Sequence, residues 1–230
     1  MAQHDGPYDG RRERDTPKVS RGSKEMEDCM GNEVTPFLQE LRVKPLEDFH
    51  CLSTFRSGVE SMDSFIRGDF RLSVENHYCS AYIVKYQEEI VAVFALSFDS
   101  LDLDSDDKEE LETGLSDAGK PDVDWNYKDT FYAKPRYPAL DIAYLAVQEK
   151  WRGHGVGNLL LDTIAEQARS QTFAGCQFLT VEALATKEYS AVGFYSHCGF
   201  APNELRNPNK DTLRMYRTLY EKDEEIDYED

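Results

Sequence analysis

The sequence predicts a mixed α/β domain, because strand-like and helix-like segments alternate along most of its 230 residues. Residues 139–147 form a near-continuous apolar run, which is typical of a central strand buried on both faces. A glycine-rich turn follows, and behind it Leu161, Ile164 and Ala168 repeat at the spacing of an amphipathic helix. We therefore expect a buried strand that leads through a tight turn into a helix.

The other elements follow from the same periodicities, taken in order along the chain. We expect strands at 37–46, 78–86, 90–98, 178–184 and 212–219, helices at 59–66, 69–75 and 187–198, and a short surface helix within 106–115. The predicted order is strand, two helices, two strands, an insert, and then strand, helix, strand, helix, strand.

The net charge of −18 is concentrated in two segments. Residues 100–124 contain ten acidic residues and two lysines, and residues 221–230 contain seven acidic residues and one lysine. We expect a disordered segment at 1–34, one domain at 35–220 with an acidic insert at 100–130, and an acidic tail at 221–230. Because nucleic-acid binders carry excess positive charge, the composition argues against a generic member of that class.

Targeting signals and cysteine spacing bear on where the protein works. No apolar run reaches the roughly 18–20 residues of a membrane span, and residues 1–21 lack the apolar core of a signal peptide. The five cysteines are scattered and never stand in C-x-x-C spacing, which favours reduced thiols over disulfides or a zinc site. These features predict a cytoplasmic protein with no membrane partner and no bound metal.

The turn Arg152-Gly-His-Gly-Val-Gly157 leaves backbone amides uncovered where a helix begins, and such a position attracts anions. A Walker loop requires a Lys-Ser or Lys-Thr pair, and none follows here. A dinucleotide-binding fingerprint requires glycine or alanine where Asn158 stands, although Glu182 does end the next strand as that motif demands. A glycine-rich connection without a ligand remains an alternative, but three alternating glycines are costly unless a backbone must be approached closely.

Two motifs in register carry a resemblance to a known family. Arg152-x-x-Gly155-x-Gly157 resembles the acetyl-CoA signature R/Q-x-x-G-x-G/A of the GNAT family of N-acetyltransferases. Downstream, Ala191-x-x-Phe194-Tyr195-x-x-x-Gly199-Phe200 is similar to that family's A-x-x-F-Y-x-x-x-G-F segment. The resemblance implies the GNAT fold, in which a mixed β-sheet splays apart at its centre and is flanked by helices.

The same resemblance implies which residues bind acetyl-CoA as co-substrate. In such enzymes it lies in the gap beside the splayed strand, so the backbone of Leu145, Ala146 and Val147 is expected to contact the acetyl and pantetheine groups. The residues expected around the pyrophosphate are Arg152, Gly153, His154, Gly155, Val156, Gly157 and Asn158. The His154 side chain is expected to face solvent. An asparagine contact common in the family is not expected, because Glu188 stands at that position.

Two side chains are candidates for the chemistry. Tyr195 matches the family's usual acid, which protonates the departing thiolate, and its alternative role is packing as a buried aromatic residue. Glu182 stands where many relatives carry a base that acts through water, and its alternative is a surface carboxylate at a strand end. Tyr144 is a weaker candidate for lining the acceptor pocket.

The expected function is N-acetyl transfer to the primary amine of a small molecule or peptide, and relatives often form homodimers. The segment 55–66 is similar to the F-x-C-G…L-D-x-F/W-L opening of acetyltransferase toxins that act on aminoacyl-tRNA, with Ser57 for the cysteine and Met62 for the leucine. A tRNA-bound acceptor is therefore an alternative. A non-catalytic acyl-CoA-binding module and a nucleotide-binding oxidoreductase are the others. The insert is expected near the acceptor entrance; one hypothesis is that it favours cationic acceptors, and the alternative is a solvated surface loop.

Overall fold

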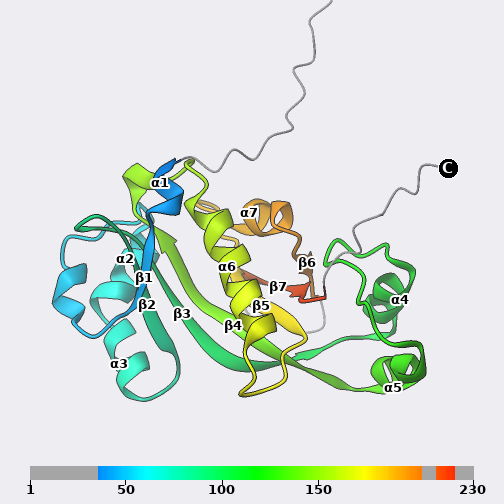
Figure 1. Ribbon diagram of the computed structural model, residues 1–230. Helices are drawn as coiled ribbons and strands as arrows, with labels where there is room; N and C mark the ends of the chain where they lie inside the picture. The colour runs from blue at the N-terminus through cyan, green and yellow to red at the C-terminus, as the bar shows by residue number, and fades with distance from the viewer. Residues whose placement is uncertain (1–35, 204–210, 221–230) are drawn as a thin grey trace, which may run out of the picture. The chain divides into compact units, whose positions relative to one another are not determined.

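A mixed β-sheet organises the computed structural model, which describes residues 36–203 and 211–220 (Figure 1). Within these residues the strand order is β1-β2-β3-β4-β5-β7-β6, and every neighbouring pair is antiparallel except β4 and β5. The strands are β1 (Arg42–Pro45), β2 (Ser80–Tyr86), β3 (Glu89–Asp102), β4 (Arg136–Val147), β5 (Phe178–Leu184), β6 (Ala201–Pro202) and β7 (Thr212–Thr218). The segments 1–34 and 221–230, predicted to be disordered and an acidic tail, lie outside the described residues.

Helices cover both faces of the sheet. The α-helices are α1 (Pro36–Gln39), α2 (Glu60–Arg67), α3 (Phe70–Glu75), α4 (Ser105–Thr113), α5 (Lys128–Ala133), α6 (Val156–Ser170) and α7 (Val192–His197), with 3₁₀ turns η1 (Phe49–Leu52), η2 (Trp125–Tyr127) and η3 (Glu149–Trp151). Leu161 and Ile164 of α6 are buried against Leu179 and Met215 on one face, whereas α2 and α3 pack on the other. No described helix has the length and apolar character needed to cross a membrane.

The two parallel strands at the centre of the sheet pair over only three residues each. Ala139–Asp141 of β4 aligns with Phe178–Thr180 of β5, and beyond this point the two strands part. The second half of β4 stays paired with β3, where the register shifts between Ala95 and Ser97. The edge of β4 that faces β5 is therefore open from residue 142 onward, and the predicted central splay is confirmed.

Two elements differ from their prediction. The strand expected at 37–46 is wrong in its first half, because α1 precedes a strand that begins only at Arg42. The apolar character of Phe37 serves packing instead: its ring stacks on Trp151 at 5.4 Å between centroids. The helix expected at 187–198 begins at Val192, since Thr186 and Tyr189 close a turn before it with a 3.0 Å backbone hydrogen bond.

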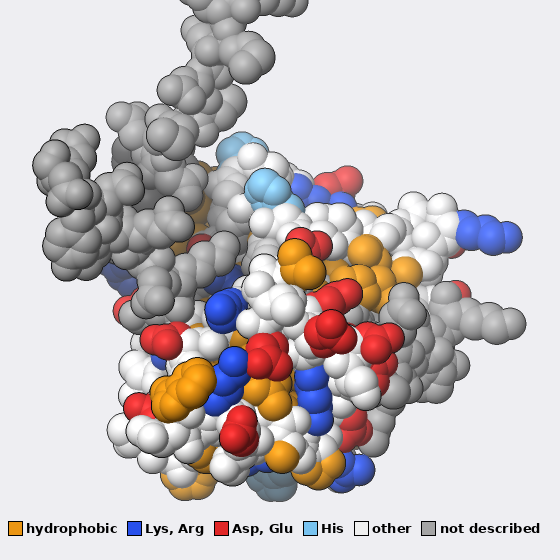
Figure 2. Space-filling model, turned by 90° about the vertical axis from the view of Figure 1, so that its right-hand side faces the viewer, with side chains coloured by type: hydrophobic (Ala, Val, Ile, Leu, Met, Phe, Trp, Pro, Cys, Tyr) orange, Lys and Arg blue, Asp and Glu red, His pale blue; other side chains and the backbone are white. Residues whose placement is uncertain are grey.

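The acidic insert folds onto the far end of the β3–β4 pair, away from the glycine turn that precedes α6 (Figure 1). Leu111 of α4 and Phe131 of α5 are fully buried, and they pack with Phe178 and Tyr216 in a core of their own. Seen from this end, acidic side chains are interspersed with basic and hydrophobic ones (Figure 2). The segment is therefore a folded part of the domain as well as a source of charge.

Candidate active site

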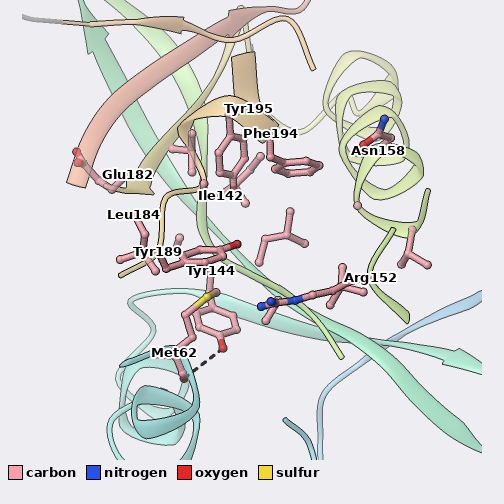
Figure 3. Close-up of a pocket in the computed structure, with 18 of the residues that line it drawn as sticks. Met62, Ile142, Tyr144, Arg152, Asn158, Glu182, Leu184, Tyr189, Phe194 and Tyr195 are labelled. Atoms are coloured by element: carbon pink, nitrogen blue, oxygen red, sulfur yellow. Dashed lines mark hydrogen bonds between the residues drawn. The ribbon is translucent and has the colours of Figure 1, made fainter. Parts of the chain in front are cut away.

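A pocket of about 970 Å³ occupies the gap where β4 and β5 part (Figure 3). Its walls come from the second half of β4, from the turn before α6, from α7, from the end of β5 and from α2. Of the predicted residues, the pocket lining includes Leu145, Ala146, Val147, Arg152, Gly153, Gly155, Val156, Gly157, Asn158, Glu182 and Tyr195, and also Tyr144. The structure thus brings together all the predicted site residues except His154.

The three glycines of the turn are required for two different structural reasons. Gly153 and Gly155 have φ angles of +76° and +80°, a backbone conformation that side chains rarely tolerate. Gly157 has helical geometry, but a Cβ atom there would lie 2.9 Å from Cζ of Phe194. Two glycines therefore shape the turn, and the third allows α7 to approach α6 closely.

The turn leaves a row of backbone amides without acceptors. The first bond of α6 is donated by Leu159 to the Gly155 carbonyl at 3.1 Å, and no side chain caps the helix. In the described part of the chain, the amides of residues 153–158 have no hydrogen-bond partner. Uncovered amides at the positive end of a helix dipole form an anion site.

Arg152 and His154 belong to this turn, but their side chains point in different directions. Arg152 is exposed, has no carboxylate partner among the described residues, and reaches into the pocket (Figure 3). The exposed His154 does not line the pocket, and its Nδ1 lies 2.8 Å from the Arg152 carbonyl oxygen. Of these two side chains, only that of Arg152 is available to a ligand in the pocket.

Tyr195 lies in the first turns of α7 and is buried, with 5% of its surface exposed. Its ring packs edge-on against Phe194 and Phe200, which fixes its position. Its hydroxyl has no hydrogen-bond partner among the described residues. Burial raises the pKa of Tyr195, and the neighbouring Tyr189 and Asp141 raise it further. The hydroxyl is therefore protonated at neutral pH and able to act as an acid.

Glu182 lies on β5 at the edge of the pocket, and its carboxylate is already engaged. Oε2 accepts a 3.0 Å hydrogen bond from Thr212, and Oε1 lies 3.3 Å from Nη1 of Arg214. Arg214 also forms an ion pair with Asp99. The carboxylate is therefore held in place by β7, the strand that pairs with β5 on its other side.

Asp141 and Asp99 form a half-buried acidic pair where the splay begins, and sequence analysis does not predict their role. The Thr180 hydroxyl donates to Asp99 at 2.6 Å and lies 3.3 Å from Asp141. Although burial opposes ionisation, the Thr180 and Arg214 hydrogen bonds hold the pKa of Asp99 below its usual value. Burial and the charge of Asp99 raise the pKa of Asp141 to about 6. The sequence did contain one sign of this pair, because Asp141 is a single aspartate within the apolar run 139–147.

The wall opposite the glycine turn is mainly apolar. Met62 and Phe65 of α2 and Leu184 of β5 contribute to it. The Tyr144 hydroxyl donates to the Met62 carbonyl at 3.3 Å, so that it joins β4 to α2 (Figure 3). No residue of the insert at 100–130 lines this pocket, so the expectation that the insert lies near the acceptor entrance is wrong.

The start of α2 is held by a buried hydrogen-bonded pair. Oδ1 of Asp63 accepts from the Ser57 amide at 2.7 Å and from the Ser57 hydroxyl at 2.6 Å. Both residues belong to the toxin-like segment 55–66. This pair therefore sets the position of the apolar wall that Met62 and Phe65 provide.

The chain matches a known domain over its central part. A family model for the acetyltransferase (GNAT) domain matches residues 123–202, which contain β4, the glycine turn, α6, β5 and α7. No curated protein sequence matches the chain. The predicted resemblance to the GNAT family is confirmed by the domain match, which supports the prediction of an N-acetyltransferase.

Solved structures share the fold at low sequence identity. A bacterial toxin is 16% identical, over 78% of this chain and 90% of that chain, with a TM-score of 0.56. AtaTR bound with AcCoA is 20% identical, over 79% of this chain and 95% of that chain, with a TM-score of 0.54. The KacTA–DNA complex is 15% identical, over 78% and 93%, with a TM-score of 0.53. At these identities the likeness shows the fold, and the predicted GNAT-type fold class is confirmed.

Proposed function

We propose that the protein is an acetyl-CoA-dependent N-acetyltransferase that acetylates a primary amine. One observation carries the proposal: Gly153 and residues 155–158, whose amides are uncovered, line the same pocket as Tyr195, whose hydroxyl has no hydrogen-bond partner among the described residues. An anion site and a protonated acid are therefore connected by the open edge of β4. The GNAT domain match over the same elements supports this assignment.

The residues present fit acetyl-CoA, which supplies an activated acetyl group. The amides of the turn and the Arg152 guanidinium would bind the pyrophosphate, since neither donates a hydrogen bond to any of the described residues. The free edge of Leu145–Val147 would bind the pantetheine amides and the acetyl carbonyl. Asn158 lines the same pocket from α6. A solved structure of the same fold holds AcCoA, which further supports the proposal.

The chemistry is direct transfer between two substrates held in the splay. The amine nitrogen attacks the thioester carbonyl, a carbon–nitrogen bond forms and the carbon–sulfur bond breaks. Tyr195 donates its proton to the departing sulfur and is then reprotonated by solvent. The proton lost by the amine passes through water to Glu182, whose carboxylate Arg214 and Thr212 hold at the pocket edge.

The acceptor is proposed to be the amine of a small molecule or peptide in the cytoplasm. The four cysteines of the described residues are all free, as reduced thiols in that compartment would be. A second candidate acceptor is aminoacyl-tRNA. Two observations favour this acceptor. The toxin-like segment 55–66 contributes to the pocket wall and is held in place by the Ser57–Asp63 hydrogen bonds. The chain also shares its fold with the bacterial toxin.

The test measures release of free CoA thiol with acetyl-CoA and a panel of amines, peptides and charged tRNAs. Tyr195→Phe should lower kcat by about 10²–10⁴-fold, the range for loss of a general acid. It should leave the Kd for CoA unchanged, because the hydroxyl acts on sulfur. Tyr78→Phe is the control, since Tyr78 is 69% exposed and does not line the pocket.

Each alternative has its own result. CoA binding without turnover on any acceptor would contradict the enzyme and favour a non-catalytic acyl-CoA-binding module. Binding of NAD(H) in place of CoA, measured by calorimetry, would favour the oxidoreductase. Turnover only with charged tRNA would select the second acceptor class over free amines.

A further inference from the structure

Tyr189 lies in the middle of the pocket and is not predicted from the sequence. Its half-buried ring reaches from the loop after β5 toward Arg152, which reaches from the loop after β4 (Figure 3). Cζ of Arg152 lies 5.6 Å from the ring centroid, within the range of a cation–π contact. The contact therefore joins the two strands that the splay separates.

In the view of Figure 3, this cation–π pair lies between two groups of pocket residues. In Figure 3, Phe194, Tyr195 and Asn158 lie on one side of the pair, and Tyr144 and Met62 lie on the other. The first side contains the proposed acid and the start of α6, and the second contains the apolar wall. Tyr189 thus stands where the donor and acceptor parts of the pocket meet.

The backbone around Tyr189 is firmly anchored. The Tyr189 amide donates to Oγ1 of Thr186 at 3.1 Å, and the Thr186 hydroxyl donates to the Tyr189 carbonyl at 3.0 Å. Ala185 and Ser190 form an isolated β-bridge, and the amide of Ala191 donates to the carbonyl of Leu184 at 2.8 Å. The ring is therefore presented from a turn that is fixed to the end of β5.

Arg152 depends on this ring for its position. Its side chain is exposed and pairs with no carboxylate among the described residues. A guanidinium that stacks on an aromatic ring uses its face, so its N–H donors remain free in the plane. An arginine without such a contact loses more rotamer freedom when it binds an anion.

We propose that Tyr189 is a positioning residue that holds the Arg152 guanidinium over the pocket, so that its donors are ready for the phosphates of CoA. This inference rests on the proposed function. Tyr189 acts here through its ring and not its hydroxyl, and it acts on binding and not on the chemical step.

The experiment measures the Kd of CoA and of pantetheine by calorimetry, for the full chain and its variants. Tyr189→Leu should weaken CoA binding about two- to fivefold, the equivalent of the ~0.5–1 kcal/mol of an exposed cation–π pair. Tyr189→Phe keeps the ring and should bind CoA as the unsubstituted protein does. Pantetheine, which has no phosphate, should bind all three equally.

A matched control lies at the end of the insert, where Lys134, just beyond it, sits over the Tyr127 ring at 5.0 Å. Tyr127→Leu removes a comparable contact away from the pocket and should leave CoA binding unchanged. In Arg152→Gln, the further substitution Tyr189→Leu should have no additional effect, because the ring then has nothing to hold. Arg152 is exposed, so this second comparison does not depend on the stability of the core.

The outcomes separate the two proposals. If the unsubstituted protein binds neither CoA nor acetyl-CoA, the proposed function fails. If it binds CoA and Tyr189→Leu binds as tightly as Tyr127→Leu, only the role of Tyr189 is overturned. Equal loss of CoA and pantetheine binding in Tyr189→Leu would also overturn it, since the effect would then not involve the phosphates.

Discussion

Gly157 at the start of α6 lies directly against the ring of Phe194 on α7. A Cβ atom on Gly157 would be 2.9 Å from Cζ and 3.0 Å from Cε2 of that ring. The two helices that carry the proposed anion site and the proposed acid are therefore fitted to each other through this contact. The absence of one side chain sets the spacing between the two parts of the site.

Gly157→Ala should destabilise the protein by about 1–3 kcal/mol, because overpacking moves a ring held between two helices. It should also weaken CoA binding, since α6 shifts relative to the pocket. Urea unfolding and calorimetry measure the two effects. Gly193→Ala is the control: nothing lies within 4 Å of its added Cβ, and alanine favours the helix by about 0.5–1 kcal/mol. Equal stability of the two variants would contradict the packing argument.

Because of Asp141, the free energy of unfolding should depend on pH. Its folded pKa of about 6 lies above the ~3.9 of an unfolded aspartate. Folding favours the protonated carboxyl group of Asp141. The resulting gain in the free energy of unfolding is fully present below pH ~3.9 and is lost as the pH rises through about 6. Asp141→Asn should therefore gain about 1–1.5 kcal/mol relative to the unsubstituted protein between pH 5 and pH 8.

The measurement for Asp141 is urea unfolding of both proteins at pH 5 and pH 8. Asp69→Asn serves as the control, because Asp69 is exposed and its side chain makes no capping hydrogen bond. A pH-independent difference for Asp141→Asn would show that burial does not favour its protonated form.

Arg214→Gln should cost about 3 kcal/mol or more of folding stability. The substitution leaves the half-buried carboxylate of Asp99 without its cation, and breaking a buried ion pair is strongly destabilising. Arg71→Gln is the matched control, because its pair with Glu75 lies on the surface of α3. Surface pairs contribute at most about 1 kcal/mol. If both substitutions cost the same, the network around Asp99 is not a stabilising element.

Ser57→Ala should destabilise the protein by about 1–3 kcal/mol, because a buried oxygen of Asp63 loses a donor. The substitution should also raise KM for the acceptor, since α2 contributes Met62 and Phe65 to the pocket wall. Thermal unfolding and steady-state kinetics measure these effects. Ser73→Ala removes an exposed hydroxyl that bonds within its own helix, and it should change neither quantity by much.

The local features of the site were predictable from the sequence. The strand at 139–147, the glycine turn and α6 depend on short-range periodicity and on conformational demands of single residues. The motif around Phe194 and Tyr195 marks α7, although the helix is shorter than its periodicity suggested. In the first predicted strand, Phe37 misled the assignment, because its apolar side chain packs on the distant Trp151.

The features that were missed depend on strand register. Asp99, Asp141 and Arg214 meet because β3, β4, β5 and β7 align in one particular way, and a sequence without pairing information does not show this. Tyr189 was missed because its partner Arg152 lies on another loop, across the splay. Tyr189 stands two residues before the Ala191 motif, and this proximity was the sequence feature that marked it as a candidate site residue.

The insert has a consequence for how the chain folds. Leu111 and Phe131 leave the ribosome before Phe178 and Tyr216, with which they form their core. During that interval Leu111 and Phe131 lack part of the apolar core that buries them in the folded domain, and exposed apolar side chains favour aggregation. The many acidic residues around them keep neighbouring chains apart by repulsion. Removing the segment would uncover Phe178 and Tyr216 at that end of the sheet.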